Sequence, residues 1–278
     1  MSQLDPKALK KERKSAGFTQ TELARRSGVA YSTLTKLEQG QIPSPSVTAV
    51  HNLADALHCT AADLLTLPKL KIALSDSIKF VYFDVGGVLV HWLPSVQAYA
   101  ERINRPYDQV LKLFYEYLGP TCRGEMDFEE FQLLCMLKLK LDPSGAGREA
   151  ALQSWVDDMR PILPTHTFIA AMSRSYPIGL LTNIGKGAYS EYIERKLVPS
   201  LKYKAVVQSC DLGVTKPDSA IYDIATQAAR AQPGDILFID DSKVNVAAAQ
   251  SFGWQAEWFD EYDPQASIKR IVARHFTA

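Results

Sequence analysis

Hydrophobic residues follow two different patterns along the chain. Up to about residue 65 they recur at helical spacing between short polar turns, and beyond residue 79 apolar runs alternate with helical stretches. Five runs have the length and composition of strands, at residues 79–84, 178–183, 204–209, 236–241 and 255–259. Four of them precede a helical or turn segment, the order typical of a parallel, doubly wound sheet. The pattern therefore predicts an α/β fold with a Rossmann-like parallel sheet, preceded by a small all-α domain.

Roughly ninety residues separate the first strand from the second, although a βαβ crossover needs only about a dozen. The inserted sequence has a helical pattern, at residues 96–102, 108–118, 128–139 and 149–159. Because it follows the C-terminal end of a strand, it would cover whatever binds there. We expect a helical cap over about residues 93–170, within an α/β domain of residues 79–278. A linker of residues 67–78 would join this domain to a helical domain of residues 1–66.

Composition and charge narrow the functional classes. The chain of 278 residues is 46% hydrophobic and 22% charged, which is ordinary for a globular protein of one or two domains. Its formal net charge is zero, so the chain as a whole is not attracted to nucleic acid. Residues 1–38, however, hold eight basic and four acidic residues, a local excess of +4 that suits phosphate contacts.

The cysteine spacing and the hydropathy of the chain favour a cytoplasmic location. The four cysteines are scattered without C-x-x-C spacing, so the sequence indicates neither a zinc site nor a disulfide framework. Residues 1–5 lack the apolar core of a signal peptide, and no apolar run is long enough to span a bilayer. We expect a cytoplasmic protein without a membrane partner.

Residues 18–40, FTQTELARRSGVAYSTLTKLEQG, contain two short helical patterns separated by Gly28. Thr19 or Thr21 can cap the first helix, and glycine permits the tight turn, so the segment has the layout of a helix-turn-helix. The second helix would expose hydroxyl, aromatic and basic side chains, namely Tyr31, Ser32, Thr33 and Lys36. Such groups can contact base edges and phosphates. The helical pattern alone leaves a protein-binding helical bundle equally open.

The same segment resembles the Xre/Cro family of phage-repressor DNA-binding domains. The resemblance extends over roughly residues 6–65, through a fourth and a fifth helix, and rests on Gln20, Leu23-Ala24, Gly28-Val29 and the LEQG sequence. It implies that Gln20 and the exposed residues of the second helix contact double-stranded DNA. It also implies a homodimer on a palindromic operator. Arg13 and Glu38 are interpreted as a structural ion pair.

Polar residues stand at the C-terminal ends of the predicted strands or directly after them: Asp84, Thr182-Asn183, Lys216 and Asp240-Asp241. Taken singly, each could be a helix cap, a turn residue or a solvated side chain. Together they form a chemically complementary set for phosphoryl transfer. That reaction needs a nucleophile, a hydroxyl or amide for the phosphate oxygens, a cation, and acids that hold Mg²⁺.

This set resembles the haloacid dehalogenase superfamily of aspartate-nucleophile phosphohydrolases, over roughly residues 79–262. The resemblance implies that Asp84 attacks phosphorus, that Thr182 binds the phosphoryl oxygens and that Lys216 screens their charge. It further implies a Mg²⁺ site formed by Asp84, the backbone carbonyl of Gly86 and one or both acids of the superfamily's fourth motif (motif four), Asp240 and Asp241. Asp241 is the favoured direct ligand of the two motif-four acids. Oxygen ligands of this kind suit Mg²⁺.

The FDVGGV and RGE sequences are similar to the branch of this superfamily that contains sugar-1-phosphate phosphatases. This branch adds four expected ligand contacts, at Gly86, Gly87, Asn183 and Arg123. A surface ion pair is an equally open interpretation of Arg123. The ligand would be a phosphorylated small molecule, such as a sugar phosphate.

Gly86 departs from most phosphatases of the superfamily, which have a second aspartate at this position. That aspartate protonates the leaving oxygen, and losing such a group costs about 10²–10⁴-fold in rate. The sugar-1-phosphatase branch shares the glycine. His91 could substitute as an acid, but a lone histidine near an apolar run is more often structural.

Three hypotheses follow. The first is a transcription regulator, in the simplest case a repressor, whose phosphatase-like domain binds a phosphorylated metabolite with Mg²⁺. The second is an active Mg²⁺-dependent sugar phosphatase with an accessory DNA-binding module. The third is a receiver-like switch phosphorylated on Asp84, which ranks lowest because receivers have no cap.

Overall fold

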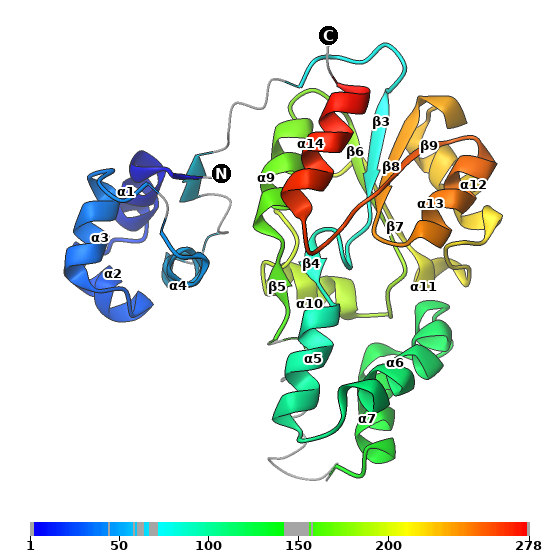
Figure 1. Cartoon of the computed structure of the whole chain (residues 1–278), viewed down its shortest axis with the longest axis horizontal. Coiled ribbons are helices and arrows are strands. Elements are labelled where there is room, and N and C mark those ends of the chain that lie inside the picture. The colour runs from blue at the N-terminus through cyan, green and yellow to red at the C-terminus, as the bar shows by residue number, and fades with distance from the viewer. Residues whose placement is uncertain are drawn as a thin grey trace. The chain divides into compact units, whose positions relative to one another are not determined.

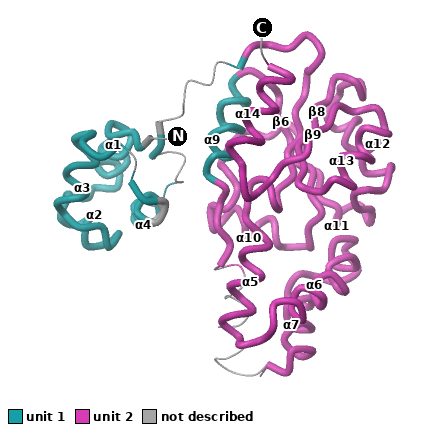
Figure 2. The backbone as a smooth tube through the Cα atoms, in the orientation of Figure 1, with its two compact units in different colours: residues 1–72, 163–174 teal, residues 73–162, 175–278 magenta. Residues whose placement is uncertain are grey.

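The computed structural model describes residues 3–43, 45–57, 59, 64–66, 72–141, 156 and 158–276. The chain divides into two compact units, residues 1–72 with 163–174 and residues 73–162 with 175–278 (Figure 2). The helix expected at residues 149–159 and most of the fifth helix of the N-terminal domain lie outside the described residues.

Short helices make up most of the described N-terminal part. Its elements are β1 (Gln3–Leu4), α1 (Pro6–Ser15), α2 (Gln20–Ser27), α3 (Tyr31–Glu38), α4 (Val47–Leu57) and β2 (Leu65–Thr66), with β1 and β2 paired antiparallel. Thr19 caps α2, and its hydroxyl and the Glu22 carboxylate form a reciprocal capping box. Gly28 ends α2 in the left-handed region at φ +67°. The predicted helix-turn-helix is therefore present.

Leucines from successive helices form the core of this unit. Leu23, Leu34 and Leu37 are completely buried, and each contributes about 1.5–3 kcal/mol through removal of its side chain from water. Beside them, Arg13 Nε lies 2.5 Å from Glu38 Oε1, and Nη2 lies 3.0 Å from Oε2. Burial opposes ionisation of Glu38, but hydrogen bonds from Arg13 and Gln20 lower its pKa. The predicted structural ion pair is confirmed.

Five described strands form a parallel sheet in the order β7-β6-β3-β8-β9 (Figure 1). Their bounds are β3 (Phe80–Phe83), β6 (Ile178–Thr182), β7 (Ala205–Gln208), β8 (Ile236–Asp240) and β9 (Gln255–Trp258). Every residue of the three central strands is buried, whereas the edge strands β7 and β9 are partly exposed. Burial on both faces explains the continuous apolar runs. All five strands lie within one residue of their predicted ends.

Helices and turns connect these strands. The described ones are α9 (Leu163–Met172), α10 (Ala188–Glu194), α11 (Ser209–Leu212), α12 (Ser219–Ala229), η2 (Pro233–Asp235), α13 (Lys243–Phe252) and α14 (Pro264–His275). One aromatic cluster packs against the sheet: Tyr82 stacks on Trp254 with ring centroids 5.5 Å apart, and its hydroxyl donates to the Ala225 carbonyl. A Cβ at Gly179 would lie 2.6 Å from the Tyr82 ring, so this strand position needs glycine.

The inserted segment is closed at its base by a two-stranded pair. β4 (Val90–His91) and β5 (Arg160–Pro161) run antiparallel, so the chain leaves the sheet domain and returns at one place. Between them lie α5 (Leu93–Arg102), α6 (Tyr107–Cys122) and α7 (Phe128–Lys138), which confirm three of the predicted cap helices. No helix among the described residues has the length and apolarity needed to cross a membrane.

Candidate functional site

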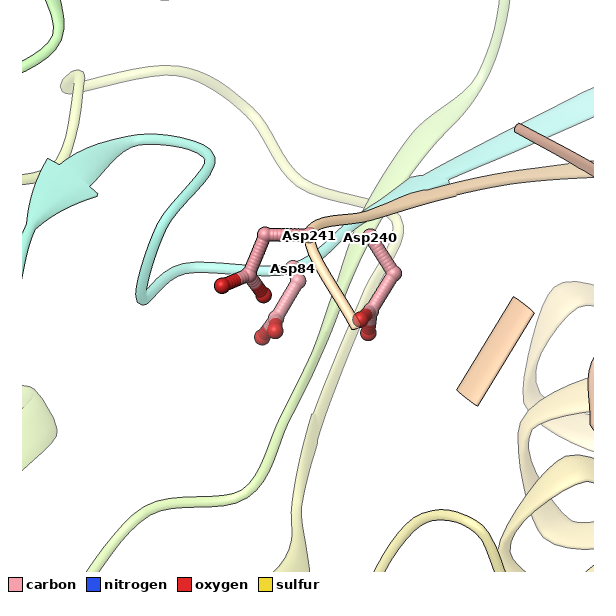
Figure 3. A group of neighbouring side chains, drawn as sticks. All are labelled: Asp84, Asp240 and Asp241. Atoms are coloured by element: carbon pink, nitrogen blue, oxygen red, sulfur yellow. The ribbon is translucent and has the colours of Figure 1, made fainter. Parts of the chain in front are cut away.

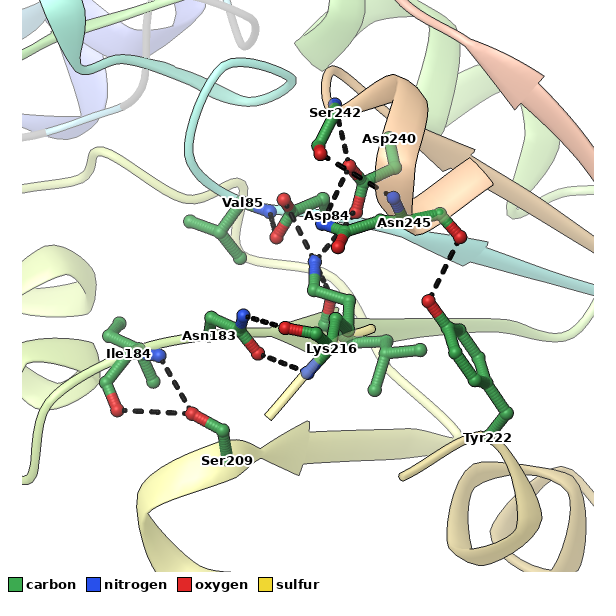
Figure 4. A network of polar contacts seen from close by, with 11 residues as sticks. Asp84, Val85, Asn183, Ile184, Ser209, Lys216, Tyr222, Asp240, Ser242 and Asn245 are labelled. Atoms are coloured by element: carbon green, nitrogen blue, oxygen red, sulfur yellow. Dashed lines mark hydrogen bonds and ion pairs between the residues drawn. The ribbon is translucent and has the colours of Figure 1, made fainter. Parts of the chain in front are cut away.

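The ends of β3 and β8 and the loop after α11 bring two aspartates and a lysine together. Lys216 Nζ lies 2.9 Å from Asp84 Oδ2 and 2.7 Å from Asp240 Oδ2, and it donates to the Leu181 carbonyl at 3.0 Å (Figure 4). All three charged side chains are buried. Burial alone would lower the pKa of Lys216, but the two carboxylates outweigh it and raise that pKa. The ammonium is therefore a fixed positive charge beneath the strand ends.

Asn183 positions the lysine through its backbone. The Asn183 amide donates to the Lys216 carbonyl and accepts from the Lys216 N–H, both at 2.8 Å. Next to it, the Ser209 hydroxyl accepts from the Ile184 N–H at 3.0 Å and fixes the same loop. Asn183 was expected to contact a ligand. It lines the cavity, but both ends of its amide already bind Lys216.

The two adjacent acids of motif four have different surroundings. Asp240 is fully buried and accepts hydrogen bonds from the Ser242 N–H and the Asn245 amide as well as from Lys216 (Figure 4). The Asp241 carboxylate lines the cavity and accepts no hydrogen bond from the described residues. Asp240 therefore has its partners within the protein, whereas Asp241 can serve a ligand.

Carboxylate oxygens of Asp84, Asp240 and Asp241 lie within 4.8 Å of one another (Figure 3). Burial, followed by repulsion from Asp84 and Asp240, raises the pKa of Asp241 to about 8. Burial also raises the pKa of Asp84 to about 7, against the opposing attraction of Lys216. Three carboxylates face one ammonium, so the ionised cluster carries two excess negative charges. A divalent cation would balance that excess.

The loop after β3 supplies a further oxygen. Its turn is closed by the Val85 carbonyl, which accepts from the Leu89 and Val90 N–H groups, and by the Gly87 N–H, which donates to the Val90 carbonyl. The Gly86 carbonyl accepts no hydrogen bond from the described residues. The donor set of carboxylates and one backbone carbonyl fits Mg²⁺, which prefers oxygen ligands.

The two neighbouring glycines serve different purposes. Gly87 has φ +71°, and a Cβ there would lie 2.2 Å from Asp241 Oδ2, so this residue must be glycine for the Asp241 carboxylate to occupy its place. A Cβ at Gly86 would meet no atom within 4 Å, and its φ lies outside the left-handed region. The position at which the sequence resemblance leads us to expect a second acid is thus open space.

A cavity of about 300 Å³ opens above these groups. Its floor is polar, with Asp84, Thr182 and Asp241. Its large side chains come mainly from the inserted segment and α10: Trp92, Tyr115, Leu118, Phe128 and Tyr192. The sequence prediction missed these wall residues, although aromatic residues recur through the insertion.

Two candidates from the insertion do not line this cavity. Arg123 forms a bidentate ion pair with Glu125, at 2.6 and 3.1 Å, and both side chains are exposed. His91 Nδ1 lies 3.3 Å from Glu261 Oε2. Neither Arg123 nor His91 is among the described residues that line the cavity. Of the two interpretations of Arg123, the structure favours the ion pair over the ligand contact.

Gly124 gives the RGE sequence a structural role, in place of the ligand contact expected of Arg123. It has φ +73°, and a Cβ at this position would lie 2.4 Å from the Cys210 carbonyl oxygen. The turn after α6 therefore approaches α11 at backbone distance. Such an approach requires glycine, and it brings the cap against the sheet domain.

In the helix-turn-helix, α3 presents an exposed polar face. Tyr31 is 53% exposed, Ser32 and Lys36 are also exposed, and Thr33 is half-buried. Gln20 is half-buried, and its amide donates to Glu38 Oε2 at 2.8 Å, which joins α2 to α3. Its contact with DNA stays a prediction. Tyr31, Ser32 and Lys36 remain the accessible candidates for DNA contact.

Chemically, the cluster can bind a phosphoryl group and offer it a nucleophile. Asp84 is oriented by its contact with Lys216 and by the Val85 N–H, which donates to Oδ1 at 2.7 Å. Thr182 lies at the end of the neighbouring strand and lines the same cavity. What the site lacks, among its described residues, is an acid at position 86 that could protonate a leaving oxygen.

Comparisons with known proteins give matches to both parts of the chain. A family model for haloacid dehalogenase-like hydrolases matches residues 78–253, and a helix-turn-helix model matches residues 9–64. A D-ribitol-5-phosphate phosphatase of Bacteroides thetaiotaomicron is 25% identical over 207 residues, covering 66% of this chain and 96% of that protein. Mouse acyl-CoA dehydrogenase family member 10 is 28% identical over 211 residues, covering 71% of this chain. The match spans only 19% of the mouse protein.

Solved structures support the same fold. A HAD-like family hydrolase from Porphyromonas gingivalis has a TM-score of 0.55 at 21% identity, covering 70% of this chain and 98% of that one. A HAD family enzyme from Bacteroides thetaiotaomicron, in complex with magnesium and inorganic phosphate, has a TM-score of 0.52 at 20% identity. That match covers 66% of this chain and 94% of the other.

Proposed function

Because the chain belongs to the haloacid dehalogenase-like hydrolase family and begins with a helix-turn-helix match, we propose that it is a DNA-binding regulator that senses a phosphorylated small molecule. The observation that carries this proposal is that the site has groups suited to binding Mg²⁺ and phosphate but has glycine, and no acid, at position 86. Carboxylate oxygens of Asp84, Asp240 and Asp241 lie within 4.8 Å of one another, whereas position 86 has no acid and is open space. A site that binds well and turns over slowly suits a sensor.

In this proposal each residue of the site has a different role in binding. Lys216 holds Asp84 in position, and Thr182 offers its hydroxyl to a phosphoryl oxygen. Asp84, Asp241 and the Gly86 carbonyl would hold Mg²⁺. The bound ion would supply positive charge between the carboxylates and the phosphate.

The finer points of the proposal rest on similarity. The D-ribitol-5-phosphate phosphatase among the relatives supports a sugar or sugar-alcohol phosphate as the ligand. The helix-turn-helix match supports binding to double-stranded DNA through α3. We extend this to a cytoplasmic homodimer that acts as a repressor on a palindromic operator, since two-fold protein symmetry is mirrored in DNA half-sites.

Selection of bound duplexes from a random library, followed by titration of the selected duplex, tests the regulator. DNA affinity would be measured with Mg²⁺ and a panel of sugar phosphates, each compared with its unphosphorylated sugar. We expect at least one phosphorylated compound to change the affinity by about fivefold or more. Unchanged affinity across the panel rejects the sensor.

An active phosphatase is the second candidate, and the intact Asp84–Lys216 pair favours it. Asp84 would attack phosphorus, the bond from phosphorus to the leaving oxygen would break, and water would then hydrolyse the aspartyl-phosphate. Without an acid at position 86, the leaving oxygen must take its proton from water. Release of phosphate from 4-nitrophenyl phosphate with Mg²⁺ tests this candidate. Activity that survives Asp84→Asn would show that the site is not responsible.

A further inference from the structure

We propose that the cavity selects a monoester with a single phosphate whose remaining part is compact and uncharged, such as a ring. This inference rests on the proposed phosphate site and names the class of molecule that the site accepts. It follows from the chemistry of the cavity walls, which are aromatic and apolar above an acidic floor.

The cavity offers no positive charge to a second anionic group. None of the described residues that line it is a lysine, arginine or histidine, and its carboxylates are Asp84 and Asp241. Of the nearby cations among the described residues, Lys186 lines a neighbouring hollow rather than this cavity, and two others are paired. Lys216 is 3% exposed and contacts two carboxylates, and Arg123 is paired with Glu125. A second phosphate or a carboxylate on the ligand would lose its hydration without gaining a partner.

The walls instead offer flat apolar surfaces. Trp92 and Tyr115 meet edge to face with ring centroids 6.0 Å apart, and both line the cavity. Tyr115 is 58% exposed. Burial and then the neighbouring Tyr107, Asp241 and Glu261 raise its pKa, so the Tyr115 ring stays neutral in negative surroundings. Such faces pack against the C–H surface of a sugar or against an aryl ring.

The size of the cavity limits the ligand. Its volume of about 300 Å³ lies at the small end of the range of about 300–1,000 Å³ for small-molecule pockets. One phosphoryl group and one ring fit this space. A second phosphate would find no positively charged partner among the described residues that line the cavity.

A matched pair of esters tests the inference, 4-carbamoylphenyl phosphate and 4-carboxyphenyl phosphate. The two differ by one negative charge at nearly constant shape. We expect kcat/KM with Mg²⁺ to be at least about tenfold higher for the carbamoyl ester. Tyr115→Arg places a cation in the cavity wall and should reduce the ratio of the kcat/KM values for the carbamoyl and carboxyl esters. The matched control is Leu137→Arg, since Leu137 is 52% exposed on α7 and does not line the cavity. This control should leave the ratio unchanged.

The corresponding phosphonates separate ligand class from turnover, because they bind without being hydrolysed. If neither ester is hydrolysed but calorimetry with Mg²⁺ shows tighter binding of 4-carbamoylphenylphosphonate, the ligand class stands and the phosphatase candidate fails. Equal binding or hydrolysis of the two members of a pair overturns the inference. A preference for the carboxylate overturns it as well. If neither phosphonate binds, the inference and the proposed phosphate site fail together.

Discussion

Replacing Gly86 with aspartate would place a carboxylic acid where the sequence resemblance leads us to expect a general acid. The structure accommodates this change, because a Cβ at position 86 meets no atom within 4 Å and the backbone there is not left-handed. The new side chain would extend beside Asp84 into the cavity that Gly86 lines. General acid catalysis contributes about 10²–10⁴-fold, or about 2.7–5.4 kcal/mol of the activation barrier at 1.36 kcal/mol per factor of ten. A Cβ at position 86 adds no steric clash that would offset this gain.

The assay compares kcat for cyclohexyl phosphate and 4-nitrophenyl phosphate at saturating Mg²⁺. We expect Gly86→Asp to raise kcat for the alkyl ester by about 10²-fold or more. The gain should be smaller for the nitrophenyl ester, whose leaving oxygen needs less protonation. Gly86→Asn is the matched control, since it has the same shape but no acidic proton. The reasoning is refuted if Gly86→Asp gives no gain, if asparagine gives the same gain, or if both esters gain equally.

Three further predictions concern the metal cluster and the cap. Because the raised pKa values of Asp84 and Asp241, about 7 and about 8, lie above the ordinary value, the metal-free protein loses stability as the pH rises from about 4 to about 8. Mg²⁺ should relieve this, so the rise in Tm with MgCl₂ in scanning fluorimetry should be larger at pH 8 than at pH 5.5; an equal rise contradicts it. Gly87→Ala places a Cβ 2.2 Å from Asp241 Oδ2, and calorimetry should show Mg²⁺ affinity reduced by about tenfold or more; wild-type affinity would show that Asp241 holds no metal. Gly124→Ala clashes with the Cys210 carbonyl and should weaken phosphonate binding by separating the cap from the sheet domain; unchanged binding speaks against that contact.

Much of the fold could be predicted because buried strands and helices have characteristic patterns of apolar residues in the sequence. The central strands are buried on both faces, so they are continuous apolar runs, and the residues that follow them converge because parallel strands end at one edge. Asp84 and Asp240 meet for this reason, and Lys216 joins them from the loop after α11. The β4–β5 pair spans only two residues in each strand, too short to produce a pattern.

Side-chain partners were harder to predict because distant segments determine them. Gln20 binds Glu38, 18 positions away, and Asn183 binds Lys216, 33 positions away. Neither pairing leaves a periodic signal. The cavity walls depend on how the cap helices are rotated and packed, which the helical period of α6 and α7 does not determine.

The most direct test of the central claim measures DNA affinity while the phosphate site is filled. Beryllofluoride with Mg²⁺ mimics a phosphoryl group on a carboxylate, so it can fill the site at Asp84 before the natural ligand is identified. By fluorescence anisotropy on a selected duplex, we expect the Kd for DNA to change by about fivefold or more. Asp84→Ala should abolish the change. An identical Kd with and without beryllofluoride, in protein shown by ¹⁹F NMR to have bound it, would contradict the account.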